Sequence, residues 1–123
     1  MGKRDMIKGT MTAIVTPFKK GQVDYDRLTA QVHFQLKHKI DGVVPVGTTG
    51  ESPTLSHEEH RRVIEHVVEV VAGARGHKAL VVAGTGSNAT SEALELTEHA
   101  RQVGADASLQ VNPYYNKPTQ EGL

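Results

Sequence analysis

Two short stretches of this sequence carry the hydroxyl groups best placed to do chemistry. The first, Gly-Thr-Thr-Gly-Glu-Ser at residues 47–52, follows the apolar run Val43–Val46. A short, β-branched run between glycines predicts a buried strand, so Thr48 and Thr49 are expected just beyond its carboxyl end, where α/β folds bind ligands. Free backbone amides and hydroxyls at such a place suit a small anion such as a carboxylate. An ordinary glycine-rich connection between a strand and a helix is the alternative.

The second stretch is the tyrosine pair Tyr114-Tyr115, which follows the apolar run at residues 107–111. The chain has three tyrosines, so two of them stand together at this point. If residues 107–111 form a parallel strand, the pair lies at the same end of the sheet as Thr48. A tyrosine hydroxyl beside a threonine hydroxyl can pass a proton along. A pair of packing or interface rings is the alternative.

Four strands and the helices between them are expected to position these residues. Asp24 and Ser56 are predicted helix N-caps, and Ser56 has the capping-box spacing to Glu59. Asn88 is expected to cap a third helix, and Pro118 to begin a fourth. The strands are nearly continuous apolar runs that begin roughly 30 residues apart, as in βαβ units, and are expected at residues 11–16, 43–46, 79–83 and 107–111.

This order of elements predicts an α/β fold with a parallel sheet whose faces are both covered. A doubly wound sheet and a (β/α)8 barrel remain open on these observations. A barrel of eight units typically needs about 250 residues. If the fold is a barrel, residues 1–123 are therefore its N-terminal half, with four strands, three helices and the start of a fourth helix, and the C-terminal half of the domain is absent.

Composition excludes several classes of protein. The formal net charge is zero and no basic block is present, so the electrostatic footprint of a nucleic-acid partner is missing. There is no cysteine, which removes disulfides and thiolate metal sites. No apolar run approaches the roughly 20 residues of a membrane span, and the polar N-terminus lacks the apolar segment of a secretion signal. A cytoplasmic protein with no nucleic-acid or membrane partner is expected.

Two motif-like patterns are interpreted as structural. Gly84-x-Gly86-x-x-Ala89, with Asp106 about 20 residues on, imitates a dinucleotide fingerprint. Asp106, however, stands at the start of the fourth expected strand, opposite the end where the ribose would lie. Histidines spread over the expected helix faces and turns are interpreted as surface residues rather than metal ligands, so no metal is expected; they are His33, His38, His66, His77 and His99.

The order of four motifs resembles that of a known enzyme family. The motifs are Thr-Ala-Ile-Val-Thr-Pro-Phe at 12–18, the hexapeptide at 47–52, Gly-Thr-Gly at 84–86 and Pro-Tyr-Tyr-Asn-Lys-Pro at 113–118. Together they resemble the dihydrodipicolinate synthase branch of the pyruvate-dependent class I aldolase and lyase family. The resemblance runs from about residue 9 to 123. The motif at 47–52 is shared with N-acetylneuraminate lyases, whereas the motif at 113–118 is more particular to the synthase branch.

The resemblance implies a (β/α)8 barrel, usually assembled as a tetramer of two tight dimers. It implies condensation of pyruvate, held as a Schiff base on a lysine, with aspartate semialdehyde in lysine biosynthesis. No separate cofactor is implied beyond this covalent pyruvate–lysine imine. Thr48 matches the family's proton-relay threonine, and the amides of Thr48 and Thr49 match its pyruvate-carboxylate site. Tyr115 matches a tyrosine that reaches across the dimer interface into the partner's relay.

A regulatory site is implied as well. Some members of the family bind lysine as a feedback inhibitor, and matching positions occur in this chain. Pro53 departs from the small residue often found there, which leaves this regulation open. The matching positions are Ser52, His57, His60, Asn88, Glu92 and Tyr114.

The family's Schiff-base lysine, second relay tyrosine and substrate arginine are expected after Leu123. A Schiff-base amine must be desolvated or otherwise have its pKa lowered, and Lys78 opens the third expected strand at the wrong end for this role. The 123-residue chain alone is therefore expected to be inactive. Two alternatives remain: another aldolase of the family, acting on N-acetylneuraminate or a 2-keto-3-deoxy sugar acid, or a non-catalytic half-barrel fragment that self-associates. The other lysines lie in expected tails, loops or helix ends, at Lys3, Lys8, Lys19, Lys20, Lys37, Lys39 and Lys117.

Overall fold

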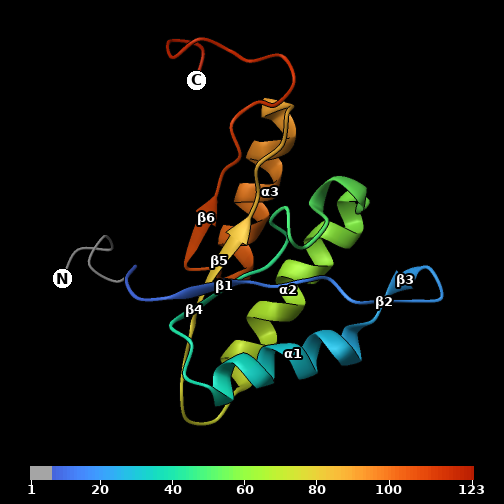
Figure 1. Cartoon of the computed structure of the whole chain (residues 1–123), viewed down its shortest axis with the longest axis vertical. Helices are drawn as coiled ribbons and strands as arrows, with labels where there is room; N and C mark the ends of the chain where they lie inside the picture. Colours follow the sequence, from blue (N-terminus) through green and yellow to red (C-terminus); the bar gives the residue numbers. More distant parts are fainter. Residues whose placement is uncertain (1–6) are drawn as a thin grey trace.

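The computed structural model describes residues 7–123, and within them four parallel strands form one sheet (Figure 1). The strand order is β1-β4-β5-β6, which follows the order along the chain. Residue pairs such as Thr12 with Val43 and Val43 with Val81 set the register. The four predicted strands are confirmed but shorter or shifted, at β1 (Met11–Ala13), β4 (Gly42–Val44), β5 (Leu80–Gly84) and β6 (Ala107–Leu109).

Three helices connect the strands: α1 (Tyr25–Lys37), α2 (His57–Gly73) and α3 (Thr90–Val103). Helix α2 lies between α1 and α3 (Figure 1). Parallel neighbours in sequential order, joined by right-handed crossovers, place their helices on the same face of a sheet. The residues directly after β1 alternate in agreement with this, because Ile14 packs in the core whereas Val15 is 51% exposed. A one-sided sheet of this kind is a barrel segment rather than a doubly wound sheet. Within residues 7–123 the expectation that both faces are covered is wrong, because Val15 and Leu109 are exposed.

The core lies between the sheet and the helices. Helix α1 contributes an apolar stripe at four-residue spacing, because Leu28, Val32 and Leu36 are buried. Fully burying one such side chain stabilises the fold by roughly 1.5–3 kcal/mol. Facing residues come from α2 and the strands, and they are Val63, Ile64, Val67, Val71, Val43, Val81 and Ala83.

Two of the three predicted N-caps are confirmed. The Asp24 carboxylate accepts from the Arg27 amide at 3.1 Å. Ser56 and Glu59 form the reciprocal capping box, with bonds of 3.1 and 2.8 Å. The Asn88 cap is wrong, because α3 begins at Thr90 with no side-chain cap. The Asn88 side chain instead accepts a hydrogen bond from the Tyr114 amide at 3.0 Å, a partner 26 residues away.

The prediction that Pro118 begins a fourth helix is also wrong. Residues 118–123 form a turn, in which the Gly122 amide donates to the Thr119 carbonyl at 3.0 Å. Such a short segment cannot offset the cost of helix nucleation by itself. The expected loop after β1 contains a small hairpin, β2 (Phe18–Lys19) with β3 (Gln22–Val23). Left-handed conformations at Lys20 and Gly21, with φ of 52° and 76°, give this two-residue turn the twist that a hairpin needs.

Within residues 7–123, no helix is both long enough and apolar enough to cross a membrane.

Candidate functional site

Thr48 and Thr49 lie where the sequence places them, in the exposed loop that follows β4. Among the described residues, neither of their backbone amides donates a hydrogen bond to another protein group. Neighbouring amides of the same loop are used, because Gly50 and Glu51 donate to the carbonyls of Gly47 and Thr48, each at 3.0 Å. The loop therefore presents two adjacent free donors and two hydroxyls, a suitable set for a carboxylate.

Buried contacts of Gly50 hold the loop at residues 47–52 in place. The buried Thr16 hydroxyl donates to the Gly50 carbonyl at 2.7 Å, which joins the loop to the segment that follows β1. Gly50 has little room for a side chain, since an added Cβ would lie 3.0 Å from the backbone of Val46. The donors of Thr48 and Thr49 are thus carried by a backbone with little freedom to move.

Val46 supplies backbone strain next to these donors. Its φ is 56°, in the left-handed region that a β-branched residue rarely enters, and its side chain is buried. Packing of that side chain into the core holds the unfavourable conformation. Strain of this kind clusters at functional sites, where the surrounding structure over-determines the backbone.

The glycines of residues 84–86 are explained by close backbone approach. An added Cβ on Gly84 would lie 2.2 Å from the Val46 carbonyl oxygen, and one on Gly86 would lie 2.3 Å from the Val111 amide. The ends of β4, β5 and β6 converge here, so the glycines need no dinucleotide to explain them. Asp106 lies at the other end of the sheet, where its carboxylate accepts from the Val81 amide at 2.9 Å.

Tyr114 and Tyr115 occupy a sharp turn beyond β6. The Asn116 amide donates to the Tyr114 carbonyl at 2.9 Å, and Tyr115 between them has a φ of 72°. This is a γ-turn of the strained, left-handed kind. The Tyr115 side chain is 98% exposed, so within this chain it packs against neither Thr48 nor Thr49. Its hydroxyl is presented outward rather than to the chain's own loop.

Two of the residues expected for a lysine site are in contact between the first turns of α2 and α3. His57 Nε2 lies 3.3 Å from Glu92 Oε1, and the Ser87 hydroxyl donates to Glu92 Oε2 at 2.5 Å. The Ser87 hydrogen bond, and to a smaller extent His57, hold the pKa of the Glu92 carboxyl below its usual range. Asn88 and Tyr114 form a second contact through the hydrogen bond described above. Ser52 is the first residue of the short helix η2 (Ser52–Thr54).

His60 is the buried member of the expected set. Its Nε2–H donates to the Gly84 carbonyl at 2.6 Å, which links α2 to the end of β5. Burial of the ring lowers the pKa of His60, with smaller contributions from His57 and His99, while the Gly84 hydrogen bond opposes the shift. One edge of this ring is therefore already occupied within the chain.

The lowered pKa of His60 gives a pH dependence of stability. Unfolded histidine titrates near about 6.5, so below that pH the unfolded chain takes up a proton that the folded state resists. The contribution of neutral His60 is fully present above this pH and is lost as the pH falls. We expect the melting temperature to fall more steeply between pH 7.5 and 5.5 in the unmodified protein than in His60→Gln. Glutamine keeps a donor for Gly84 but does not titrate, so equal slopes would contradict this role.

His66 and His77 also have hydrogen-bond partners within the chain. His66 shares a hydrogen bond of 2.6 Å with the Thr29 hydroxyl, and His77 donates to the Ile40 carbonyl at 2.7 Å. Both are partly buried, so the surface interpretation is incomplete for them. Within residues 7–123, no three histidine, aspartate or glutamate side chains are grouped to hold a metal ion. Sequence reasoning missed Thr16, whose partner Gly50 is brought close by the fold, and Ser87, whose hydroxyl donates to Glu92 five residues further on.

A family model supports the same assignment as the motifs. Residues 6–123 match the model of the dihydrodipicolinate synthetase family. The chain belongs to this family. A curated relative, the 4-hydroxy-tetrahydrodipicolinate synthase of Methanocaldococcus jannaschii, is 58% identical over 118 residues, which are 96% of this chain and 39% of the relative. The chain thus spans about two-fifths of the length of the curated relatives it matches.

Solved structures of the family have the same fold. The dihydrodipicolinate synthase of Acinetobacter baumannii in complex with pyruvate matches with a TM-score of 0.87 and 49% identity, over 94% of this chain and 39% of that one. The enzyme of Cyanidioschyzon merolae with lysine bound matches with a TM-score of 0.85 and 44% identity, over 91% and 37%. These matches confirm the predicted α/β fold with a parallel sheet, as the N-terminal portion of the family's (β/α)8 barrel.

Proposed function

We propose that residues 1–123 are the N-terminal part of a single-barrel 4-hydroxy-tetrahydrodipicolinate synthase, which condenses pyruvate with aspartate semialdehyde in lysine biosynthesis. The loop at Thr48 and Thr49 is the observation that carries this proposal. It offers two adjacent free amides and two hydroxyls at the carboxyl end of β4. A family member of the same fold has been solved in complex with pyruvate, whose carboxylate such a loop suits.

Thr48 and Thr49 have defined tasks in this proposal, and Thr16 and Val46 support them. The amides of Thr48 and Thr49 bind the carboxylate of pyruvate. The amine of a lysine from the rest of the barrel adds to the ketone carbon to give a carbinolamine, which expels its protonated hydroxyl as water and becomes the imine. The Thr48 hydroxyl passes the protons that these two steps need. The Thr16 hydrogen bond and the strained Val46 hold the loop so that its donors are oriented before the substrate arrives.

Tyr115 is proposed to act in the active site of a second copy of the protein. Its side chain is 98% exposed on a strained turn, which fits a residue that becomes buried only on assembly. We propose that it reaches the Thr48 relay of the partner in a homodimer, within a dimer or tetramer. A biosynthetic enzyme of this kind would act in the cytoplasm.

The activity is tested in a complete barrel. We define the complete enzyme as residues 1–123 joined to the C-terminal part of the Methanocaldococcus jannaschii relative. Borohydride reduction in the presence of pyruvate should trap one adduct per chain, and mass spectrometry should place it on a lysine outside residues 1–123. Absence of an adduct, or an adduct within residues 1–123, would contradict the proposal. Turnover of a sugar aldehyde in preference to aspartate semialdehyde would favour the other aldolases of the family.

We also propose that α2 and α3 contribute a lysine-binding site. The relative from Cyanidioschyzon merolae was solved with lysine bound. Here the Glu92 carboxylate is held ionised beside His57, and Asn88 joins the Tyr114 turn to the same edge. A carboxylate that is already oriented by the Ser87 hydroxyl can accept the ammonium group of lysine.

Calorimetry of the complete enzyme should show lysine binding that depends on Glu92. A hydrogen bond to a charged group contributes roughly 1.5–3 kcal/mol, so Glu92→Gln should weaken binding at least about tenfold. The control is Glu95→Gln, one turn further along α3. Within residues 7–123, the Glu95 carboxylate has a single partner, the exposed Arg61 guanidinium at 3.9 Å, and is not part of the proposed site. No heat of binding at millimolar lysine, or equal effects of the two variants, would rule out this site.

A further inference from the structure

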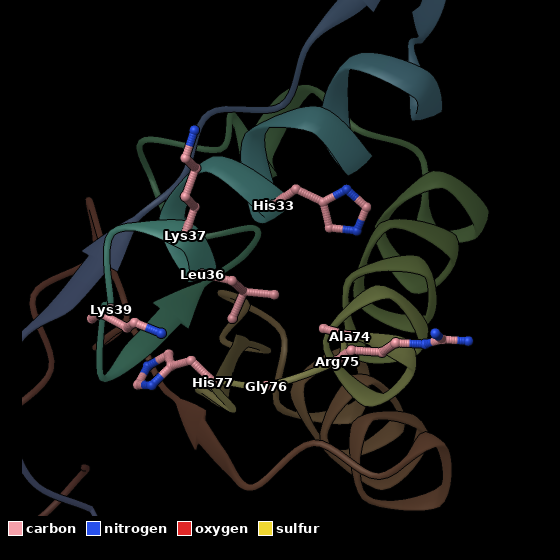
Figure 2. A pocket seen from close by; sticks show the side chains of 8 residues that line it. All are labelled: His33, Leu36, Lys37, Lys39, Ala74, Arg75, Gly76 and His77. Atoms are coloured by element: carbon pink, nitrogen blue, oxygen red, sulfur yellow. The ribbon is translucent and has the colours of Figure 1, made fainter.

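Polar side chains are arranged differently at the two ends of the sheet. At the amino end, a pocket of about 320 Å³ lies between the C-terminal end of α1 and the loop that joins α2 to β5. The charged ends of its lysines and its arginine point apart, so they offer no common binding point (Figure 2). At the carboxyl end, three polar side chains from different segments do meet. They are Thr85 after β5, Thr97 in α3 and Gln110 after β6.

Gln110 joins the two threonines through its side-chain amide. Its Nε2 lies 2.6 Å from the Thr85 hydroxyl and 2.8 Å from the Thr97 hydroxyl, so each of its two N–H groups has an acceptor. The two threonine hydroxyls share a third hydrogen bond of 2.9 Å. These uncharged groups therefore form a closed triangle between the ends of two strands and α3.

Burial of Thr85 does not explain why Gln110 takes part. The Thr85 side chain is fully buried, so its hydroxyl needs a partner, but Thr97 already supplies one. Gln110 itself is exposed, where water could satisfy its amide. What Gln110 adds is a fixed link from the chain after β6 to α3.

The chain that follows this link carries Tyr115. We call residues 110–115 the tyrosine arm. In Figure 1 the arm leaves β6 and runs beside α3. Residues 110–115 contain neither helix nor strand, so the path of the arm depends on bonds to its neighbours.

Two contacts with the loop between β5 and α3 guide the arm beyond its first residue. An added Cβ on Gly86 would lie 2.3 Å from the Val111 amide nitrogen, which shows how closely the two backbones approach. The Asn88 side-chain oxygen accepts from the Tyr114 amide at 3.0 Å. The arm is therefore held along its length up to the residue before Tyr115.

We infer that Gln110 is a positioning residue for Tyr115. It fixes the base of the tyrosine arm against Thr85 and Thr97, and so sets the direction in which the arm leaves the sheet. That direction decides where the Tyr115 hydroxyl lies in the active site of the partner. The inference rests on the role in the dimer that is proposed above for Tyr115.

The test is a double-mutant cycle of Gln110→Met and Tyr115→Phe in the complete enzyme. Methionine has the length of glutamine but lacks both N–H donors. Because a misplacement of about 1 Å can lower a rate roughly 10²-fold, Gln110→Met should lower kcat by about ten- to a hundredfold. The KM for pyruvate should hardly change, since Thr48 and Thr49 lie on another loop. In Tyr115→Phe, which lacks the hydroxyl, adding Gln110→Met should lower kcat by less than about twofold further.

Two more variants keep the test specific. Gln102→Met makes the same exchange on the surface of α3, where the glutamine amide donates to exposed Glu98 at 3.1 Å, and it should leave kcat unchanged. Thr97→Val keeps the shape of threonine and removes one of the two acceptors of Gln110. It should lower kcat less than Gln110→Met does, again with little further effect in Tyr115→Phe. Thr97→Val replaces Gln110→Met in the cycle if the latter does not fold.

The outcomes that would overturn the inference are distinct from failure of the proposed function. Normal kcat in Gln110→Met, or equal fold-losses with and without the Tyr115 hydroxyl, would remove Gln110 as a positioning residue and leave the pyruvate adduct in place. Normal kcat in Tyr115→Phe would remove the roles of both residues. Absence of the borohydride adduct in the unmodified complete enzyme would instead contradict the proposed function, and this inference with it.

Discussion

Replacing Thr48 by valine in the complete enzyme should lower turnover by roughly 10²–10⁴-fold, the range for a positioned proton transfer. Valine keeps the β-branched shape and the backbone amide of threonine but removes the hydroxyl. The side chain is exposed in a loop, so the melting temperature should hardly change. The measurement is kcat for condensation of pyruvate with aspartate semialdehyde, with thermal unfolding recorded on the same samples.

A matched control separates the hydroxyl of Thr48 from hydroxyls in general. Thr90 is exposed at the first residue of α3, and no hydrogen bond of its side chain is found within residues 7–123. Thr90→Val should therefore keep normal turnover. Near-normal turnover in Thr48→Val would remove Thr48 from the proton relay and leave only its amide in the site.

Residues 1–123 expressed alone should form no pyruvate adduct and should self-associate. The lysine with the most backbone contacts, Lys78, lies at the amino end of β5 and caps the end of α2, far from the loop at Thr48 along the sheet. Strands β1 and β6 are the two edges of the sheet, and β6 has neither a charge nor a proline to discourage pairing with another chain. Apolar side chains that a complete barrel would cover are exposed, including Val15, Leu109 and Val111.

Light scattering should therefore give a mass above that of one chain, and borohydride trapping with pyruvate should leave the mass of each chain unchanged. The complete enzyme, treated in parallel, is the positive control for trapping. A stable monomer would show that the sheet edges and the exposed apolar side chains are tolerated. A specific adduct on any lysine of residues 1–123 would mean that the Schiff-base residue lies within this chain.

The sequence by itself determined those features whose partners lie within a few residues along the chain. Asp24 caps α1 through Arg27, and Ser56 with Glu59 caps α2, because an N-cap needs only the amides of its own first turn. The apolar stripe of α1 follows from helical periodicity alone. The spacing of the apolar runs predicted the parallel strands, and the position of Thr48 and Thr49 followed because they come directly after one of them.

Only the tertiary structure decided the features that depend on distant partners. Asn88 could cap a helix, but the Tyr114 amide, 26 residues away, takes its side chain. The left-handed Val46 is held by core packing, and its carbonyl leaves no room for a side chain at Gly84. The contact of His57 with Glu92 and the hydrogen bond of buried His60 to the Gly84 carbonyl likewise join different elements. No local pattern encodes such contacts, because they exist only after the helices have packed on one face of the sheet.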